Sequence, residues 1–479
     1  ESIALVAKSG EQLPYERLPL NESKTFNLLR SGNTVGVFQL ESPAQRALQR
    51  RLGADNMEDI VASLALIRPG PIKGNMVDPF LARRRGEEAV TYPRPELKPV
   101  LEKTYGVVLF QEQVIEIARL VAGFSAGEAD QLRRVMTQAR SEKEMAALGE
   151  KFVARAVEQG LAAQEAENIF STIAGYANYG FCEAHAAAFA VTAYKTAYLS
   201  AHYPTQYLAA LLNCQPLGYY PPWVLIGEAR RRLIKILPPD INSSAAAYTV
   251  ENNAIRIGLR QIKGMQEKLL TALLSERKKR IFSSWEDFNR RLDLPSHLRE
   301  AMILTGACSF TNPNRRALLW QEQTGRKGLR LPDFTPAEKV ALEWERLGFS
   351  WSEHPLALIR LQLAKEGVLP ISSADQQPAG SKFWLAGLPI RPHRPPTRSG
   401  RPVAFLSLED ETGLLDLTVF EDVYRRYGQI LFGGQFKPLL VRGYNQKRGH
   451  HSGFIAREVR VLNFKWGLEG GIFATKANI

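Results

Sequence analysis

The sequence contains little cysteine and none of the motifs that accompany several common chemistries. Its three cysteines are far apart and form no C-x-x-C pair, so neither a zinc site nor a disulfide framework is expected. There is no G-x-x-x-x-G-K-S/T phosphate loop and no serine or cysteine nucleophile elbow. No apolar run reaches the roughly 18 residues that a membrane-spanning helix needs. We therefore expect a protein of the reducing cytoplasm without a membrane partner.

The sequence also lacks an initiating methionine and a leader segment. It begins at Glu1, and no charged segment followed by an apolar one comes after it. We expect the chain to be a piece of a longer polypeptide that starts inside a domain. Its 479 residues are too many for one ordinary hydrophobic core, and they predict roughly three or four domains.

Positive charge is what the sequence has in excess. There are 62 Lys and Arg residues against 49 Asp and Glu residues, which gives a formal net charge of +13. Such an excess favours a polyanionic partner, and nucleic acid is a better candidate than an anionic membrane surface. A basic, solvated surface without a partner has the same composition. The positions of the cations must therefore decide between these interpretations.

The hydrophobic pattern changes along the chain from helical to strand-like. Residues 24–212 have mainly helical spacing, and Ser42 is a predicted N-cap. From Phe383 onward the period is two, and the pattern predicts five strands and one short helix at residues 421–430. The expected fold class is a mainly α-helical first domain, a small helix-hairpin-helix domain, and then a small all-β barrel of the OB type.

A first basic cluster lies in the segment DQLRRVMTQARSEKE, residues 130–144. It contains Arg133, Arg134, Arg140 and Lys143 within about three helical turns. Arginine forks match phosphate oxygens, so a helix with these side chains is suited to a triphosphate or a DNA backbone. A solvated helix end is the structural alternative.

Two further segments combine turn residues with groups that bind nucleotides. In RPGPIKG the prolines and glycines hold Arg68 and Lys73 on stiff, non-helical backbone. In YANYGFCEAH a tight turn precedes His185 at a helix start, and the neighbouring aromatic side chains are able to stack on bases. Packing of these rings in the core, with a structural histidine, is the alternative.

Basic residues also occur in the two C-terminal regions. IKGMQEKLL is a weak helix-hairpin-helix candidate that contains Lys263 and Gly264 but has Gln266 in place of a second glycine. The nearby SERKKR adds charge that a solvated face explains equally well. The predicted barrel has basic residues near its loops, and these suit single-stranded DNA or a protein-docking rim: Arg391, Arg394, Arg442 and Arg448. Its acidic pairs, in LEDETG and FEDVY, are expected on the barrel surface away from basic clusters.

Several blocks together resemble the bacterial DNA polymerase III alpha subunit, a C-family replicative polymerase. The blocks are GVFQLES, RPGPIKGNMVDPF, YGVVLFQEQV, LRRVM, YGFCEAHAAAFA and LPPDIN, in family order along nearly the whole chain. The resemblance implies the end of a palm domain, fingers, a helix-hairpin-helix domain, a connector, an OB domain and a tail, at residues 1–30, 31–245, 246–325, 326–378, 379–466 and 467–479.

The resemblance also implies roles for the residues named above. Arg133, Arg134 and His185 match the family's nucleotide site. DNA contacts are expected from Arg68, Lys73, Arg140, Lys143, Lys263, Gly264, Arg391, Arg394, Arg442 and Arg448. The family's catalytic palm aspartates, which bind Mg²⁺, have no counterpart in this chain, so the chain alone is expected to be inactive and to contain no metal site.

Two details of the resemblance bear on the subtype. Glu183 matches the error-prone branch of the family, and the clamp-binding Q-x-x-L/M-F segment is reduced to LRLPDF, residues 329–334. We expect primer-template DNA, single-stranded DNA, deoxynucleoside triphosphates and other polymerase or repair subunits as partners, with weak or no direct clamp binding. Alternatives are a replicative subunit without its clamp motif and a non-catalytic DNA-binding protein derived from the subunit.

Overall fold

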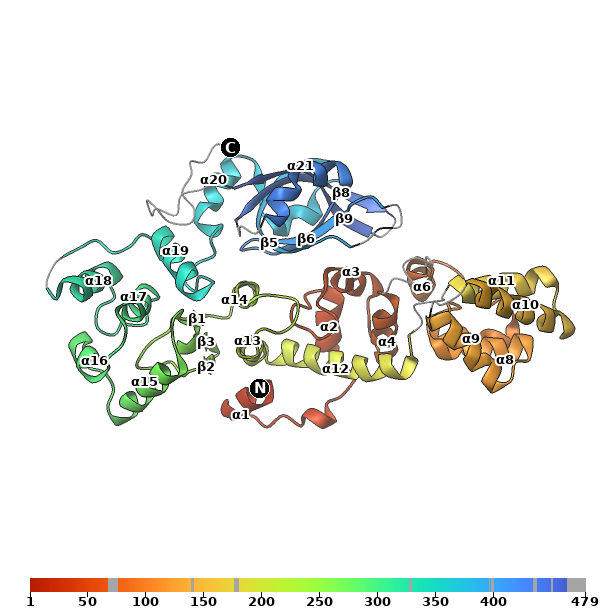
Figure 1. The fold of residues 1–479 in the computed structure, drawn as a ribbon, viewed down its shortest axis with the longest axis horizontal. Helices are drawn as coiled ribbons and strands as arrows, with labels where there is room; N and C mark the ends of the chain where they lie inside the picture. The colour runs from red at the N-terminus through yellow and green to blue at the C-terminus, as the bar shows by residue number, and fades with distance from the viewer. Residues whose placement is uncertain are drawn as a thin grey trace. The chain divides into compact units, whose positions relative to one another are not determined.

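The structure is a computed structural model that describes residues 1–67, 76–138, 142–175, 181–326, 330–395, 397, 400–433, 437–448 and 451–462. It divides into two compact units (Figure 1). The helical unit is Pro14–His202, and the mixed unit combines Glu1–Leu13 with Tyr203–Ile479.

The helical unit consists of helices around one core. Its helices are η1 (Tyr15–Arg17), α2 (Ser23–Ser31), α3 (Pro43–Leu52), α4 (Met57–Leu66), α6 (Val77–Arg84), η2 (Pro95–Leu97), α7 (Lys98–Leu101), η3 (Glu102–Thr104), α8 (Gln111–Ala122), α9 (Ala126–Gln138), α10 (Glu142–Glu158), α11 (Ala163–Gly175) and α12 (Glu183–His202). Figure 1 shows α8, α9, α10 and α11 grouped together beyond one end of α12.

Local sequence explains where these helices begin and which face they bury. The Ser42 hydroxyl accepts a hydrogen bond from the Gln45 N–H at the start of α3, as predicted for an N-cap. On α8, Val114, Ile117 and Val121 lie on one face and are at most 3% exposed. The Tyr194 hydroxyl, in the middle of α12, donates a 2.9 Å hydrogen bond to the Pro19 carbonyl. That bond fixes α12 against the segment that precedes α2.

The first part of the mixed unit is helical with a small sheet. Its elements are α1 (Ser2–Lys8), α13 (Pro204–Asn213), α14 (Pro222–Arg231), β1 (Ile236–Leu237), β2 (Thr249–Glu251), β3 (Ala254–Arg256), η4 (Leu259–Gln261), α15 (Glu267–Lys279), α16 (Trp285–Arg291), α17 (Ser296–Leu304), α18 (Arg315–Thr324) and α19 (Pro336–Leu347). β3 lies between β1 and β2 in the sheet. Trp285, Phe288 and Leu298 are core residues of the helices that follow.

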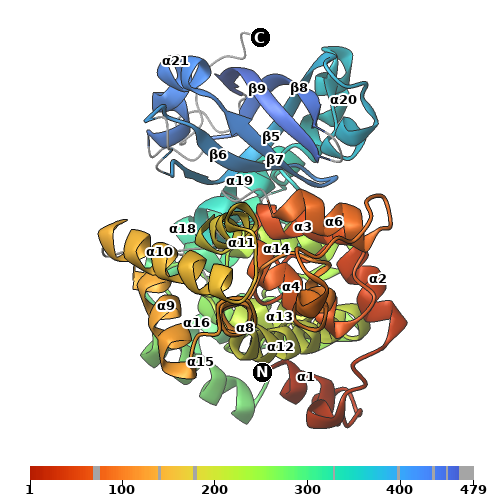
Figure 2. The same cartoon turned by 90° about the vertical axis from the view of Figure 1, so that its right-hand side faces the viewer.

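The second part of the mixed unit is a barrel with a covering connector. Its elements are η5 (Ala357–Ile359), α20 (Arg360–Lys365), β4 (Val368–Leu369), η6 (Ile371–Gln376), β5 (Lys382–His393), β6 (Ala404–Glu409), β7 (Leu414–Val419), α21 (Glu421–Phe432), β8 (Leu439–Arg448) and β9 (His451–Val461). Figure 2 shows the strands wrapped around one another with α21 beside them.

Strand pairing in the barrel follows a ring. β5 pairs with β6, β6 with β7, β7 with β9, β9 with β8, and β8 with β5 again. The β7–β9 seam is parallel and has only two residue pairs, so the barrel is only loosely closed there. The helix α21 connects β7 to β8. This order is that of an OB fold, and the predicted fold class is confirmed.

Candidate nucleic-acid and nucleotide interface

Arg133 and Arg134 on α9 are held by one carboxylate. Nη2 of Arg133 lies 2.7 Å from Oδ1 of Asp130, and Nε of Arg134 lies 2.8 Å from Oδ2. Arg133 also donates to Gln111 on α8, and its side chain is 29% exposed against 67% for Arg134. The hydrogen bond from Arg133 lowers the pKa of Asp130, which keeps this carboxylate ionised. Both guanidinium groups therefore converge on one point of negative charge.

His185 is exposed in the first turn of α12 and belongs to a row of rings. Its ring centroid lies 4.2 Å from that of Phe189 and 5.2 Å from that of Phe181. Phe189 in turn lies 5.3 Å from Phe38, which is 36% exposed. Sequence reasoning missed Phe38 and Phe189, although the four-residue spacing of His185 and Phe189 on one helix was a usable signal.

The predicted hairpin at Lys263 and Gly264 precedes α15. Lys263 is exposed, and its backbone N–H donates a 2.9 Å hydrogen bond to the Arg346 carbonyl. Gly264 has φ +92°, and a Cβ added there would lie 3.5 Å from the His297 ring at the start of α17. The glycine is therefore required by backbone conformation rather than by crowding.

Three of the predicted barrel arginines have described side chains, and each of the three lies over an aromatic ring. Arg394 lies 5.5 Å from the Tyr424 ring centroid, and Arg442 lies 5.8 Å from that of Trp384. Arg391, at a positive φ of 41° beside a β-bulge, lies 5.0 Å from the Tyr219 ring and donates to the Gly218 carbonyl. Arg391 therefore also contacts the loop before α14.

The remaining predicted site residues lie outside the described residues, or have only their backbone described. Arg68, Lys73 and Arg140 lie outside the described residues. Lys143 and Arg448 lie on α10 and β8, but the structure describes only their backbone. A helix face shared by Arg133 and Arg140 is likewise outside the described ranges.

The expectation for the acidic pair in LEDETG was wrong. Glu409 and Asp410 are both 0% exposed, and they pair with Arg231 and Arg360. Both arginines come from helices outside the barrel strands, α14 and α20, and they balance the charge of the buried carboxylates. In LRLPDF, the Phe334 ring lies 4.6 Å from the Arg316 guanidinium, so this ring is engaged within the chain.

The described residues contain no group of three or more His, Cys, Asp or Glu side chains that is arranged to hold a metal ion. No helix in the described ranges has both the length and the apolar character to cross a bilayer.

Comparison with known proteins points to one family. Residues 2–160 match the model of the bacterial DNA polymerase III alpha subunit finger domain, and residues 233–318 match a helix-hairpin-helix model. An error-prone DNA polymerase of Symbiobacterium thermophilum is 48% identical over 514 aligned residues, covering 94% of the chain and 47% of that protein. The resemblance to the polymerase III alpha subunit is confirmed. The second match supports the predicted helix-hairpin-helix domain.

Other relatives have the same description and similar coverage. Error-prone DNA polymerases of Anaeromyxobacter dehalogenans and Corynebacterium glutamicum are each 37% identical, over 90% and 91% of the chain. The matches cover 40% and 42% of those two proteins. The chain thus spans less than half the length of the curated relatives it matches.

Proposed function

We propose that the polypeptide to which this chain belongs is a DNA-directed DNA polymerase of the error-prone type. The chain supplies its fingers, helix-hairpin-helix and OB domains, with the domain boundaries predicted from the sequence. The observation that carries the proposal is 48% identity to an error-prone DNA polymerase over 94% of the chain. The finger-domain match and the OB strand order support the same assignment.

Catalysis is assigned to a palm domain outside this chain. Template-directed synthesis needs carboxylates that bind Mg²⁺, which offsets the charge that develops on the transferred phosphoryl group. The predicted palm aspartates lie in segments that precede GVFQLES. The chain alone is accordingly proposed to bind substrates without extending a primer.

Within the fingers, Arg133 and Arg134 are proposed to bind the triphosphate of the incoming nucleotide. Their convergence on Asp130 supports this role, because the same two cations can reach a single polyanion from adjacent positions on α9. His185 is proposed to lie beside the nucleotide, where its exposed ring row offers a stacking surface. Arg68, Lys73, Arg140 and Lys143 are proposed to face the DNA.

The C-terminal domains are proposed to bind DNA. Lys263 and Gly264 present a hairpin to the backbone of duplex DNA, and Arg394 and Arg442 present charge and rings to a single strand. Arg391 and Arg448 belong to the same proposed surface. Other polymerase or repair subunits are proposed as partners in the cytoplasm, with little direct binding to a sliding clamp.

The test is primer extension by the complete polypeptide and by this chain alone, with matched primer-template DNA binding. The complete polypeptide should extend a primer with Mg²⁺ and all four nucleotides, and the chain alone should only bind. If the complete polypeptide binds DNA and extends nothing, the non-catalytic DNA-binding alternative holds. High-fidelity synthesis by the complete polypeptide would favour a replicative subunit that has lost its clamp motif.

A further inference from the structure

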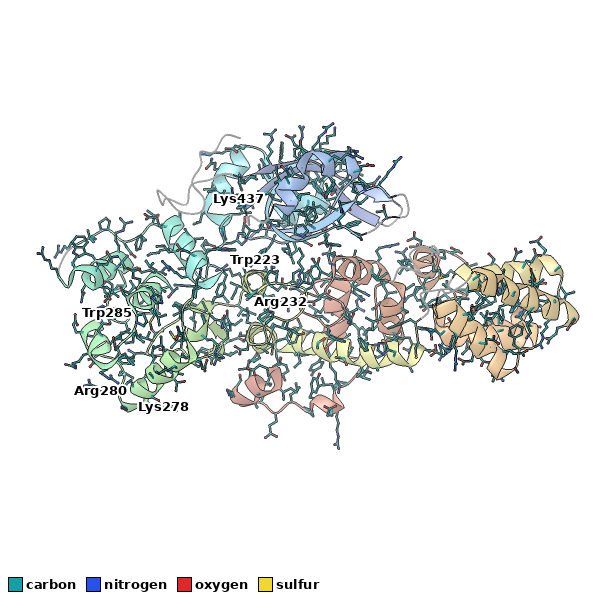
Figure 3. All side chains as sticks on the ribbon, in the orientation of Figure 1. Trp223, Arg232, Lys278, Arg280, Trp285 and Lys437 are labelled. Carbon is teal, nitrogen blue, oxygen red and sulfur yellow. The ribbon has the colours of Figure 1, made fainter. Side chains whose placement is uncertain are left out.

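A compact basic corner lies where α15 ends and α16 ends. We define the α15–α16 corner as Lys278, Lys279, Arg280, Ile281, Arg290 and Arg291. All of these except Arg291 are exposed. Figure 3 labels Lys278 and Arg280 side by side at the end of α15, at the outer edge of the ribbon.

The carboxylate of Asp287 orients three of these arginines. Its side chain is only 4% exposed, and it accepts from Arg280 at 2.9 Å, Arg290 at 3.0 Å and Arg291 at 3.3 Å. Arg291 is 13% exposed and lies over the Phe282 ring, so it belongs to the interior. Arg280 and Arg290 are 63% and 75% exposed. Two guanidinium groups are therefore held in place at one edge while most of each group faces solvent.

The carboxylates near the α15–α16 corner are too few to neutralise its positive charge. Glu276 pairs with Lys279 and Arg291, and Asp287 is shared among three arginines. Glu286 is engaged by the side-chain amide of Gln321 at 2.6 Å. Among the described residues no ion pair is found for Lys278. The corner thus has a surplus of positive charge next to Ile281, an apolar side chain that is 65% exposed.

We propose that the α15–α16 corner binds the phosphate backbone of duplex DNA, as a second contact in addition to the hairpin at Lys263 and Gly264. Arg280 and Arg290 donate to phosphate oxygens, Lys278 adds charge, and Ile281 packs on the sugar edge. The corner lies at the opposite end of α15 from the hairpin.

Two observations favour a duplex over a single strand. The rings beside the corner, Phe282, Trp285 and Phe288, are at most 3% exposed, so bases have nothing to stack on. The 13 residues of α15 separate the two contacts by about 20 Å. Two contacts held at a fixed distance suit a rigid duplex better than a flexible single strand.

The test measures affinity of the complete 479-residue chain for a fluorescent duplex and for a single strand, as a function of salt. The double variant Arg280→Gln and Arg290→Gln removes both exposed guanidinium groups, while Arg291 can still pair with Asp287. Arg94→Gln with Arg119→Gln removes the same charge from arginines that pair with glutamates in the helical unit. Thermal unfolding checks that each variant is folded.

For the corner variant, the slope of log affinity against log salt on duplex DNA should become less steep by about 1.8, at about 0.9 for each phosphate contact. Single-strand binding and the control variant should change little. Should the double variant fail to fold, Lys278→Gln with Ile281→Ser is used, because both side chains are exposed; it should reduce duplex affinity and flatten the slope by about 0.9.

The proposal would be overturned if the corner variant had the same duplex affinity and salt slope as the control variant. It would also be overturned if the corner variant lost affinity only for the single strand. The proposal takes DNA as the ligand from the proposed function. It requires no catalysis, however, so loss of duplex binding and failure of primer extension are separate results.

Discussion

Arg231 on α14 and Glu409 at the end of β6 form a buried ion pair. Nη1 of Arg231 lies 2.8 Å from Oε1 of Glu409, whose side chain is 0% exposed. Gly227, one turn earlier on α14, makes room for this carboxylate, because a Cβ there would lie 2.1 Å from Oε1. Arg231 also pairs with Glu228 on its own helix. This contact attaches α14 to the barrel within the mixed unit.

Removing one partner of this pair should be costly. Arg231→Met leaves the Glu409 carboxylate buried without its guanidinium, so the free energy of unfolding of the mixed unit should fall by about 3 to 5 kcal/mol. Guanidinium unfolding of the complete chain, followed by tryptophan fluorescence, measures this change. The matched control is Arg425→Met, which breaks an exposed pair with Glu421 and should cost under about 1 kcal/mol. Equal losses for both variants would contradict the buried-pair account.

The barrel should be sensitive to a methyl group at Gly443. A Cβ there would lie 2.2 Å from the Ile455 carbonyl oxygen and 2.6 Å from the Phe454 ring, at a register shift between β8 and β9. Gly443→Ala should lower the free energy of unfolding by about 1 to 3 kcal/mol. Gly453→Ala is the control, since nothing lies within 4 Å of its added Cβ. If the two variants unfold alike in denaturant, β8 and β9 are packed differently.

Asp287 should contribute to stability in a defined acid range. A hydrogen bond from the Ser283 N–H, aided by Arg290, Arg280 and Arg291 against the opposing effect of burial, lowers the pKa of Asp287 from 3.8 to about 2. Because the folded pKa is the lower one, the contribution is fully present above about pH 4 and is lost as the pH falls towards about 2. The stability difference between the protein and Asp287→Asn should shrink across this range in unfolding curves. A difference that stays constant with pH would refute the role of the charge.

Single-stranded DNA should bind to the barrel through Arg394 and Arg442. Each guanidinium lies over an aromatic ring, so both charge and a stacking surface are available. In the complete chain, Arg394→Gln with Arg442→Gln should make the salt slope for single-strand binding less steep by about 1.4, at about 0.7 for each contact. The double variant Arg94→Gln and Arg119→Gln is again the control. An unchanged slope would indicate a barrel that docks protein.

Local signals in the sequence predicted most of the fold. Ser42 was predicted to cap α3 because its hydroxyl stands directly before a helix that begins with proline, where it can accept a backbone N–H. The alternation of apolar and polar residues after Phe383 predicted the strands of the barrel. The burial of Glu409 and Asp410 was not predictable. Their partners, Arg231 and Arg360, are 178 and 50 residues away in sequence, and no local pattern encodes such a pairing.

Around the candidate site, part of the local geometry was predictable. The sequence placed Arg133 and Arg134 together on a helix, as α9 shows, but the carboxylate that orients both of them, Asp130, was missed. An i, i+3 and i+4 acid–base pattern from Asp130 to Arg133 and Arg134 was present in the sequence as a signal. Likewise, SERKKR was recognised only as charge, because the role of Asp287 depends on the packing of α16.

The central claim is that Arg133 and Arg134 bind the phosphates of the incoming nucleotide. A charge-assisted phosphate contact contributes about 1.5 to 3 kcal/mol, so Arg133→Ala or Arg134→Ala should raise the nucleotide KM roughly ten- to a hundredfold. Arg→Lys at either position should rescue poorly, since an ammonium cannot fork across two oxygens. Gln111→Ala removes a neighbour of Arg133 without removing a cation, and it should have a smaller effect.

The measurement that tests this claim most directly is nucleotide KM and DNA Kd, determined separately for the complete polymerase polypeptide with Arg133→Ala or Arg134→Ala. We predict a raised nucleotide KM with an unchanged DNA Kd. A weakened DNA Kd with an unchanged nucleotide KM would show that these arginines bind the DNA backbone and would contradict the account.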